Sequence, residues 1–507
     1  MKKKLLATGV AVALGALSGV ASAAVTVNAG GVGQINVLPY YSVQEGNDTL
    51  ISITNTDTTR GKAVKVRFRG AEWSDDVFDF QIFLSPGDMW TGAVTKDGNL
   101  AKMSTSDSSC TLPASVNQAF VPIRLQAAAQ NTGTLEGYVE VITMADIPAT
   151  GTGAGNLTAN WAVTKDLYNA IKHVAGGKPA CRTDATAQTL LEGLTQDNVL
   201  VPAGAPQNAW MVAPTASLTT FATIINVPTS KAFTFPATAL VESAPLKQYF
   251  EQSNNALAFN VALTADNIFA PIAANGGAEL PMYQFDMPDL STPTNAVDVL
   301  AVDQRDAIAT LLAKASVTTE YVTNDSLLAS TDVVISQPVR RYFYEYTQKA
   351  AGQTFHLTIP DSTGTNHNYD VNGDVGTVYQ PLDGATNRIA VANPRFFDRE
   401  ENTFTSSSGI VISPTPPSAI TPISLKGEVS VVSINNSGLP TGALNASITA
   451  NDYTATGGYS DGWTTLSTTS QGTNGGALPV IGFSAINLFN ASAGAAGTNY
   501  GMTLPLK

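Results

Sequence analysis

Hydrophobic and polar positions alternate with a period of two through the first part of the chain, from residue 24 to about residue 147. In the segment 64–69 the even positions are Val or Phe and the odd positions are Lys or Arg. This alternation is typical of antiparallel strands that bury one face and leave the other in water. We therefore expect the side chains of Lys65, Arg67 and Arg69 to face solvent, and the same pattern recurs over 78–84 and 136–143.

Turn sequences separate these predicted strands. Residues 46–48 (Gly-Asn-Asp) precede the predicted strand 49–54, and residues 85–88 (Ser-Pro-Gly-Asp) place Pro and Gly where a type II turn needs them. Several short strands at this spacing predict an immunoglobulin-like antiparallel β-sandwich over residues 24–150. The Cys and Trp spacing of a true immunoglobulin domain is absent.

The period changes after residue 150. Apolar residues at 161, 167, 168, 171 and 174 recur at helical spacing and end at two glycines, which predicts one amphipathic helix. Leucines at 190, 191 and 194 predict a second, short helix. We therefore expect a small helical insertion at 151–215, followed by a β-rich C-terminal region at 216–507 with one further helix near 296–315. The predicted fold class is mainly β, with immunoglobulin-like antiparallel β-sandwich domains and this insertion.

The first 23 residues have the pattern of a secretory signal peptide. Three lysines are followed by an apolar run over residues 5–20 and by Ala21-Ser22-Ala23, which predicts cleavage before Ala24. The alternative is an N-terminal membrane anchor, but the run is shorter than the roughly 20 residues that span a bilayer. The sequence predicts an exported protein that is extracellular or on the cell surface, with the periplasm as the alternative, and no transmembrane segment in the mature chain.

The acidic composition of the chain limits the classes of molecule that it could bind. The chain carries 27 Lys and Arg against 40 Asp and Glu, a formal net charge of −13, and no basic block interrupts this excess. Because a strongly acidic chain repels a phosphate backbone, the sequence argues against nucleic-acid binding. The partners that remain are a second copy of the chain, other envelope components, or extracellular glycans.

Two cysteines, Cys110 and Cys181, are the only ones in the chain. In an oxidising compartment they predict one intramolecular disulfide, and the alternatives are two free thiols or an intermolecular bridge. With only three histidines besides, the chain lacks the ligands of a usual zinc site.

One segment resembles a catalytic motif. Residues 458–462 fit the G-x-S-x-G pattern around Ser460, which in a nucleophile elbow follows a strand, precedes a helix and comes before the histidine. Here His173, His356 and His367 all lie upstream, and the flanks are rich in Thr and Gly, so we interpret the match as chance. We expect no catalytic residue and no cofactor-binding residue.

Oxygen-bearing residues alternate at Asp370, Asn372 and Asp374, as in a calcium loop. The glycine of such a loop is displaced and the twelfth position holds no glutamate, so a tight turn is the favoured alternative and calcium the only cofactor candidate.

Other groups could serve a saccharide. Three tyrosines, at 342, 344 and 346, share one face of a predicted strand. They could stack on sugar rings, but we favour the alternative that neighbouring elements pack over them. Carboxylates are paired at 75–76, 286 and 289, and 400–401, but in a chain with 40 acidic residues such neighbours need no function.

Three stretches together resemble a known family. The first is residues 39–56, beginning Pro-Tyr-Tyr-Ser-Val. The second is residues 63–69 followed by 79–92, with Leu-Ser-Pro and Trp-Thr-Gly, and the third is residues 478–490. They are similar to a family of uncharacterised secreted or cell-surface proteins of Gram-negative bacteria. The resemblance implies export to the envelope or beyond and implies no catalytic residues.

The sequence thus predicts a non-enzymatic secreted or cell-surface protein of the bacterial envelope, structural or adhesive. The alternative is a secreted glycan-binding protein or carbohydrate-active hydrolase. A carboxylate pair within about 10 Å in an aromatic-lined groove favours the hydrolase, whereas a filled, convex sandwich favours the structural protein.

Overall fold

The computed structural model describes most of the chain between residues 25 and 507. The described residues are 25–72, 74, 76–122, 130–149, 161–174, 177–195, 209–252, 287–295, 301–339, 345–347, 356–360, 366–370, 389–391, 395–399, 423–425, 427–435, 442–447, 450–454, 460–468, 477–490, 492 and 497–507. The protein is mainly β, with few helices, as the sequence predicts. Its mostly antiparallel sheets are consistent with β-sandwiches, and the immunoglobulin-like detail stays a prediction.

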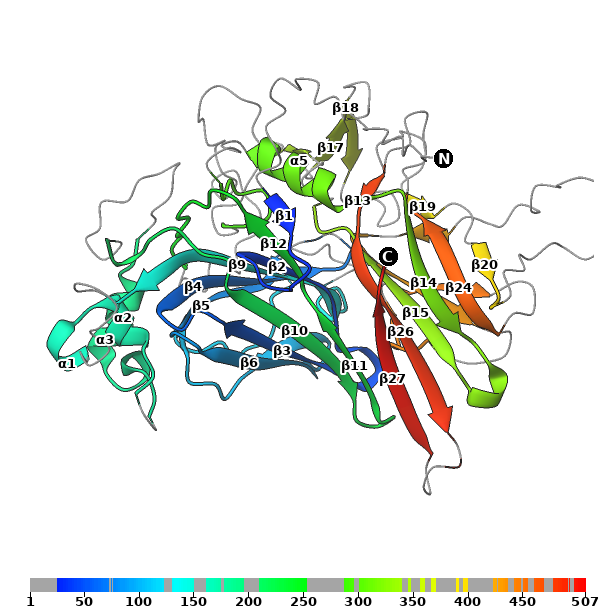
Figure 1. The fold of residues 1–507 in the computed structure, drawn as a ribbon, viewed down its shortest axis with the longest axis horizontal. Helices are drawn as coiled ribbons and strands as arrows, with labels where there is room; N and C mark the ends of the chain where they lie inside the picture. Colours follow the sequence, from blue (N-terminus) through cyan, green and yellow to red (C-terminus); the bar gives the residue numbers. More distant parts are fainter. Residues whose placement is uncertain are drawn as a thin grey trace, which may run out of the picture.

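The N-terminal part is a sandwich of two sheets (Figure 1). One sheet has the order β1-β12-β2-β9-β4-β5-β8, with β1 Val25–Val27, β2 Ile35–Ser42, β4 Arg60–Gly70, β5 Asp76–Leu84, β8 Cys110–Leu112, β9 Glu136–Pro148 and β12 Thr238–Glu242. The other has the order β11-β10-β3-β6-β7, with β3 Asn47–Asn55, β6 Met89–Asp97, β7 Leu100–Ser104, β10 Leu218–Asn226 and β11 Lys231–Pro236. A 3-10 helix, η1 Gln44–Gly46, leads into β3.

The apolar half of the period-two pattern forms the core of this sandwich. Val64, Val66 and Phe68 are fully buried. Phe80 packs on Trp90 with ring centroids 5.5 Å apart. At 85–88 the predicted turn is present, with the amide of Asp88 bonded to the carbonyl of Ser85 and Gly87 at a φ of 68°.

The sandwich also recruits strands that follow the helical insertion. β10 pairs with β3, and β12 pairs with both β1 and β2. Residues 218–242 therefore complete the N-terminal sheets, although the sequence pattern placed them in the C-terminal region that starts at 216.

The polar half of β4 is buried, so the expected solvent-facing row is wrong. Lys65, Arg67 and Arg69 are between 0 and 2 % exposed. Later parts of the chain cover them: Lys65 Nζ donates to Gln252 Oε1 at 2.8 Å, and Arg67 Nη1 donates to the carbonyl of Pro288 at 2.5 Å. Burial lowers the pKa of Lys65, and the carboxylate of Asp79 opposes this.

The helical insertion contains short helices. They are α1 Trp161–Thr164, α2 Leu167–Ile171, the 3-10 helix η2 Ala180–Arg182, and α3 Ala185–Glu192. The second predicted helix is confirmed as α3, but the single amphipathic helix is wrong. Lys165 has a φ of 51°, which ends α1, and the carboxylate of Asp166 accepts a hydrogen bond from the amide of Asn169 and starts α2.

The predicted disulfide fixes this insertion to the sandwich. Cys110 in β8 and Cys181 in η2 are bonded, with their Cα atoms 6.0 Å apart. Ile171 and Tyr168 pack in the same buried cluster as Phe83 of the sandwich.

The C-terminal part contains a second pair of facing sheets. The five-stranded sheet has the order β23-β22-β15-β26-β27, with β15 Ser330–Ser336, β22 Val429–Asn435, β23 Ala450–Thr454, β26 Ile481–Asn490 and β27 Thr498–Pro505. The three-stranded sheet has the order β14-β24-β20, with β14 Ser316–Val322, β20 Arg395–Phe397 and β24 Asp461–Ser467. The smaller elements are α5 Ala301–Leu312, β13 Ala313–Lys314, η5 Asp325–Leu327, β16 Glu345–Thr347, β17 His356–Pro360, β18 Asn366–Asp370, β19 Ile389–Val391, β21 Ile423–Leu425 and β25 Leu478–Pro479. Helix α5 lies within the range predicted at 296–315.

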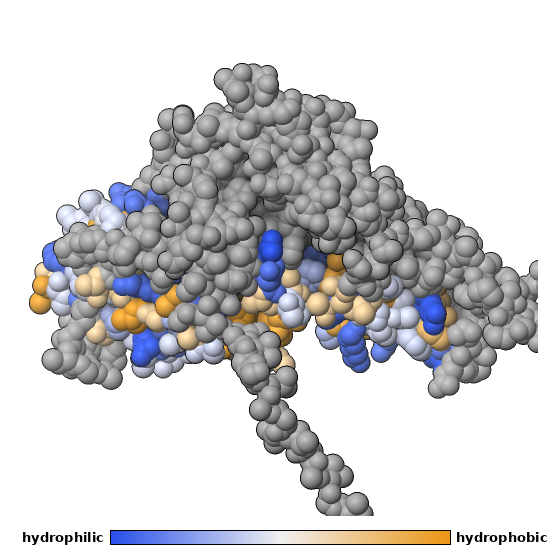
Figure 2. Space-filling model, turned by 90° about the horizontal axis from the view of Figure 1, so that it is seen from above, coloured by the Kyte–Doolittle hydropathy of each residue, from blue (hydrophilic) through white to orange (hydrophobic). Residues whose placement is uncertain are grey.

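The central strand of the five-stranded sheet, β15, is buried on both faces. Val333 on one face packs with Leu466 of the three-stranded sheet. On the other face, Phe483 stacks on Phe235 of the N-terminal sandwich at 4.0 Å, and Figure 1 shows β27 beside β11. The three-stranded sheet is therefore an outer layer, and the outward residues of β14 on its other face are exposed or half-buried. In the space-filling view of Figure 2, apolar and hydrophilic residues are interspersed where the described residues are in sight.

Candidate functional site

The outer face of the three-stranded sheet carries the candidate site, and β14 shows how its side chains are sorted. Val317, Thr319 and Tyr321 point into the core and are buried, whereas Thr318, Glu320 and Val322 alternate with them on the outer face. Because residues opposite each other in an antiparallel pair share a face, the register names the neighbours of each outer residue.

An aromatic pair lies at the centre of this face. Glu320 of β14 is opposite Trp463 of β24, and Trp463 is opposite Phe397 of β20. The rings of Trp463 and Phe397 stack with centroids 3.8 Å apart and an interplanar angle of 6°. Trp463 is 36 % exposed. A large, flat apolar surface therefore lies beside a carboxylate that faces solvent.

A glycine permits the close approach of these two strands. A Cβ atom at Gly462 would clash with the carbonyl oxygen of Phe397, which is backbone and cannot swing away. The absence of a side chain there lets β20 lie against β24 and brings the ring of Phe397 onto Trp463.

An ion pair closes one end of the face. Arg399 follows β20, and its Nε lies 3.3 Å from Oδ2 of Asp461 at the start of β24. Asp461 is opposite Val322, one outer position along from Glu320 on β14. The ion pair is solvent-accessible, with Arg399 79 % exposed and Asp461 32 % exposed.

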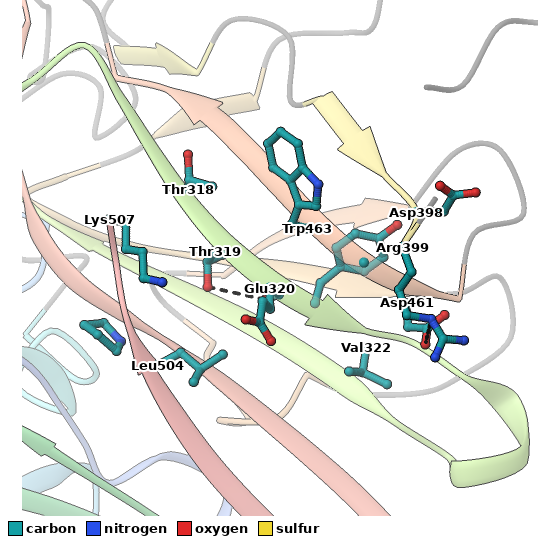
Figure 3. Close-up of a pocket in the computed structure, with 13 residues that line it drawn as sticks. Thr318, Thr319, Glu320, Val322, Asp398, Arg399, Asp461, Trp463, Leu504 and Lys507 are labelled. Atoms are coloured by element: carbon teal, nitrogen blue, oxygen red, sulfur yellow. Dashed lines mark hydrogen bonds and ion pairs between the residues drawn. The ribbon is translucent and has the colours of Figure 1, made fainter. Parts of the chain in front are cut away.

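The last residues of the chain close the other end. Lys507 and Thr318 exchange two backbone hydrogen bonds, at 2.9 and 3.1 Å, so the segment after β27 adds a short stretch to the edge of the sheet. Together these elements line a groove of about 770 Å³ (Figure 3). Its lining residues are Thr318, Thr319, Glu320, Tyr321, Val322, Asp398, Arg399, Asp461, Gly462, Trp463, Leu504, Pro505 and Lys507.

Ser460 lies next to this groove, but its backbone differs from that of a nucleophile elbow. The residues that follow it form strand β24 and not a helix. Its carbonyl accepts a hydrogen bond from the amide of Thr323 at 2.7 Å, and its hydroxyl is 3.4 Å from Oδ1 of Asp461. The side chain of His173 is in the helical insertion, where Nε2 lies 3.5 Å from Oδ2 of Asp88.

The calcium candidate lies mostly outside the described residues. Asp370 ends strand β18, and Asn372 and Asp374 are not described. Among the residues that the structure describes, no group of three or more His, Cys, Asp or Glu is arranged to hold a metal ion. The tyrosines at 342 and 344 are also outside the described residues, and Tyr346 is in β16.

Two of the paired carboxylates are structural. Asp76 and Asp289 form ion pairs with Arg67 and Arg69, respectively, in the buried polar layer over β4. Residues 75, 286, 400 and 401 lie outside the described residues.

Glu320 and Trp463 were not identified from the sequence. In the segments 316–322 and 461–467, apolar or small residues alternate with polar ones. This alternation could have predicted that the side chains of Glu320 and Trp463 face outward. Their pairing joins strands about 140 residues apart, which no local pattern encodes.

Comparison with protein families, with curated proteins and with solved structures finds no match to this chain. Within the described residues, none of the helices has both the length and the apolar character needed to cross a bilayer.

Proposed function

We propose that this protein is an exported, non-enzymatic protein of the bacterial envelope or cell surface that adheres to glycans through the groove at Trp463. The observation that carries the proposal is the stack of the exposed Trp463 on Phe397 on the outer face of the three-stranded sheet. It is supported by the mixture of acidic and basic side chains around the stack.

The chemistry of the groove suits a saccharide. A sugar ring has one face of C–H groups and a rim of hydroxyls, so it needs a flat apolar surface with hydrogen-bonding groups at its edges. Trp463 supplies the surface. Glu320 can accept hydrogen bonds from hydroxyls, and Arg399 can donate them.

Export is supported by two features. The first 23 residues have the signal-peptide pattern, and the disulfide between Cys110 and Cys181 is of the kind that persists in oxidising compartments. Sequencing the N-terminus of the exported protein should find Ala24. Cell fractionation with immunogold labelling should find it at or beyond the envelope. A start at Met1 or a cytoplasmic location would contradict export.

Glycan binding is tested with the purified mature protein on an array of bacterial and host oligosaccharides, followed by titration calorimetry on the glycans retained. Trp463→Ala should weaken binding about tenfold or more, because stacking and burial of the indole are lost. Phe221→Ala is the matched control, since Phe221 is also an exposed aromatic residue (43 %) but lies on the N-terminal sandwich. Unchanged binding in Trp463→Ala, or the absence of any bound glycan, would refute the proposal.

One observation favours a second candidate, a carbohydrate-active hydrolase. Glu320 and Asp461 are diagonal neighbours across β14 and β24. Diagonal Cβ atoms are about 7–8 Å apart, and inverting glycosidases separate their two carboxyl groups by about 6.5–9.5 Å. Against it, Asp461 is held by Arg399 in an ion pair. Release of reducing sugar from a bound glycan, abolished in Glu320→Gln, would favour the hydrolase over adhesion.

A further inference from the structure

We propose that the outer face of the three-stranded sheet selects saccharides that carry acidic groups, and that such a ligand lies across the strands between Lys507 and Arg395, beside the groove. This inference rests on the proposed glycan binding and names its ligand class. It is carried by a row of side chains beside Trp463 rather than by Trp463 itself.

The register places four residues in this row. Lys507 is bonded through its backbone to Thr318, Thr318 is opposite Thr465, and Thr465 is opposite Arg395. Residues paired in this way share a face, so two cations flank two threonines on the outer side of the sheet. Strands lie about 4.8 Å apart, so the backbones of Lys507 and Arg395 are separated by about 14 Å.

Neither cation of this row has an acidic partner. Within the described residues, Lys507 and Arg395 form no ion pair, and both are exposed. The cations of β4 are different, since Lys62, Lys65 and Arg67 each contact a carboxylate. In a chain with 40 acidic residues against 27 basic ones, two unpaired cations in one row form a local site for anions.

The chemistry of the row suits carboxylate or sulfate groups on a sugar. A guanidinium group can bind either in a bidentate manner, and an ammonium group binds them as a point charge. The hydroxyls of Thr318 and Thr465, between the two cations, can donate to and accept from sugar hydroxyls. Glu320 lies one outer position further along β14, so it repels acidic groups from that side and orients the ligand with its acids toward the row.

An acidic saccharide fits this face better than an acidic peptide. The position next to Thr465 on the outer face of β24 is Trp463, whose exposed ring offers a flat apolar surface beside the cations. Rings with C–H faces and acidic substituents present both features together, whereas a run of acidic side chains presents only the charge.

The test compares one neutral oligosaccharide, its uronic-acid counterpart of equal length, and poly-glutamate, each titrated against the mature protein at low and high salt. We expect the acidic saccharide to bind about tenfold more tightly than the neutral one at low salt, because one charged hydrogen bond contributes about that factor. Added salt should reduce the difference. The double variant Lys507→Gln, Arg395→Gln should bind both saccharides equally. Lys96→Gln, which removes an exposed cation of the N-terminal sandwich, is the charge-matched control and should behave as wild type.

The outcomes separate this inference from the function on which it rests. Equal binding of both saccharides, dependent on Trp463 and insensitive to salt, would overturn the acidic preference and leave glycan binding intact. Binding of neither saccharide would refute both. Poly-glutamate binding as tightly as the acidic saccharide, and unaffected by Trp463→Ala, would replace the saccharide with an acidic peptide.

Discussion

Arg67 donates a hydrogen bond from Nε to Oδ2 of Asp76 at 2.9 Å, and both side chains are buried. The carbonyl of Pro288 accepts a further hydrogen bond from Nη1 of Arg67. Burial and the neighbouring Arg69 lower the pKa of Arg67, but nearby carboxylates raise it above its ordinary value overall. The pair belongs to a polar layer in which the cations of β4 meet carboxylates on the adjacent strands β5 and β9.

Asp76→Asn should destabilise the protein by about 3 kcal/mol, the lower part of the range for breaking one side of a buried ion pair. The lower part applies because Asp79 and Glu140 also face Arg67. The measurement is the free energy of unfolding in urea. The matched control is Asp97→Asn, whose partner Lys102 is 40 % exposed, and its effect should stay below about 1 kcal/mol. Equal effects of the two variants would mean that the layer contributes no more than a surface pair.

This layer marks a limit of prediction from the sequence. The apolar positions of β4 identify the core side, since Val64, Val66 and Phe68 are all buried. The alternating cations look the same whether water or another segment covers them. The covering residues, such as Gln252 and Pro288, come about 190–220 residues later, and local periodicity carries no information about such a distant contact.

The candidate site has the same limit for a related reason. The outward direction of Trp463 follows from the alternation of its own strand. Its neighbours Glu320 and Phe397 come from strands elsewhere in the chain, and only the register brings them together. In contrast, the sequence does contain a signal for the break between α1 and α2. Asp is a common N-cap residue, and Asp166 directly precedes the apolar residues of α2.

A second prediction concerns Asp332, a fully buried carboxyl in β15 that accepts a hydrogen bond from the amide of Leu444 at 2.7 Å. Burial raises its pKa above the ordinary value of 3.8, although hydrogen bonds and Lys231 oppose the shift. Between these two pKa values the folded protein binds more protons than the unfolded chain. The contribution of this carboxyl to stability is therefore complete below the ordinary value and is lost as the pH rises through the raised one.

Asp332→Asn keeps an acceptor for the amide of Leu444 and removes the titration. The free energy of unfolding of the variant, relative to wild type, should therefore increase as the pH rises from about 4 to 8. Urea denaturation at a series of pH values measures this difference. Curves that stay parallel over the whole series would show that Asp332 does not titrate with a raised pKa.

The disulfide gives a third prediction. Cys110 and Cys181 are 71 residues apart in sequence, and closing a loop of that length stabilises by roughly 4 kcal/mol in the chain-entropy model. The double variant Cys110→Ser, Cys181→Ser should lose about that amount. Non-reducing peptide mapping of the exported protein should recover the linked peptides. Reduced wild type serves as the control and should match the double variant, and two alkylatable thiols in native protein would contradict the pairing.

The last prediction is that Ser460 is not a nucleophile. A serine hydroxyl attacks only when an adjacent base accepts its proton. The hydroxyl of Ser460 lies 3.4 Å from Oδ1 of Asp461, and Asp461 forms an ion pair with Arg399. The described side chain of His173 is beside Asp88 in another part of the fold. In a nucleophile elbow a helix begins directly after the serine, whereas here Ser460 is followed by strand β24.

A fluorophosphonate probe should therefore leave Ser460 unlabelled, and Ser460→Ala should bind glycans as wild type does. Because Ser460 adjoins the groove, this variant also separates glycan binding from catalysis on that face: Trp463→Ala should weaken binding about tenfold or more, and Ser460→Ala should not. Stoichiometric labelling that disappears in Ser460→Ala, together with turnover of a model ester, would reverse the conclusion. The groove would then be a catalytic centre with a base supplied from residues that the sequence pattern did not identify.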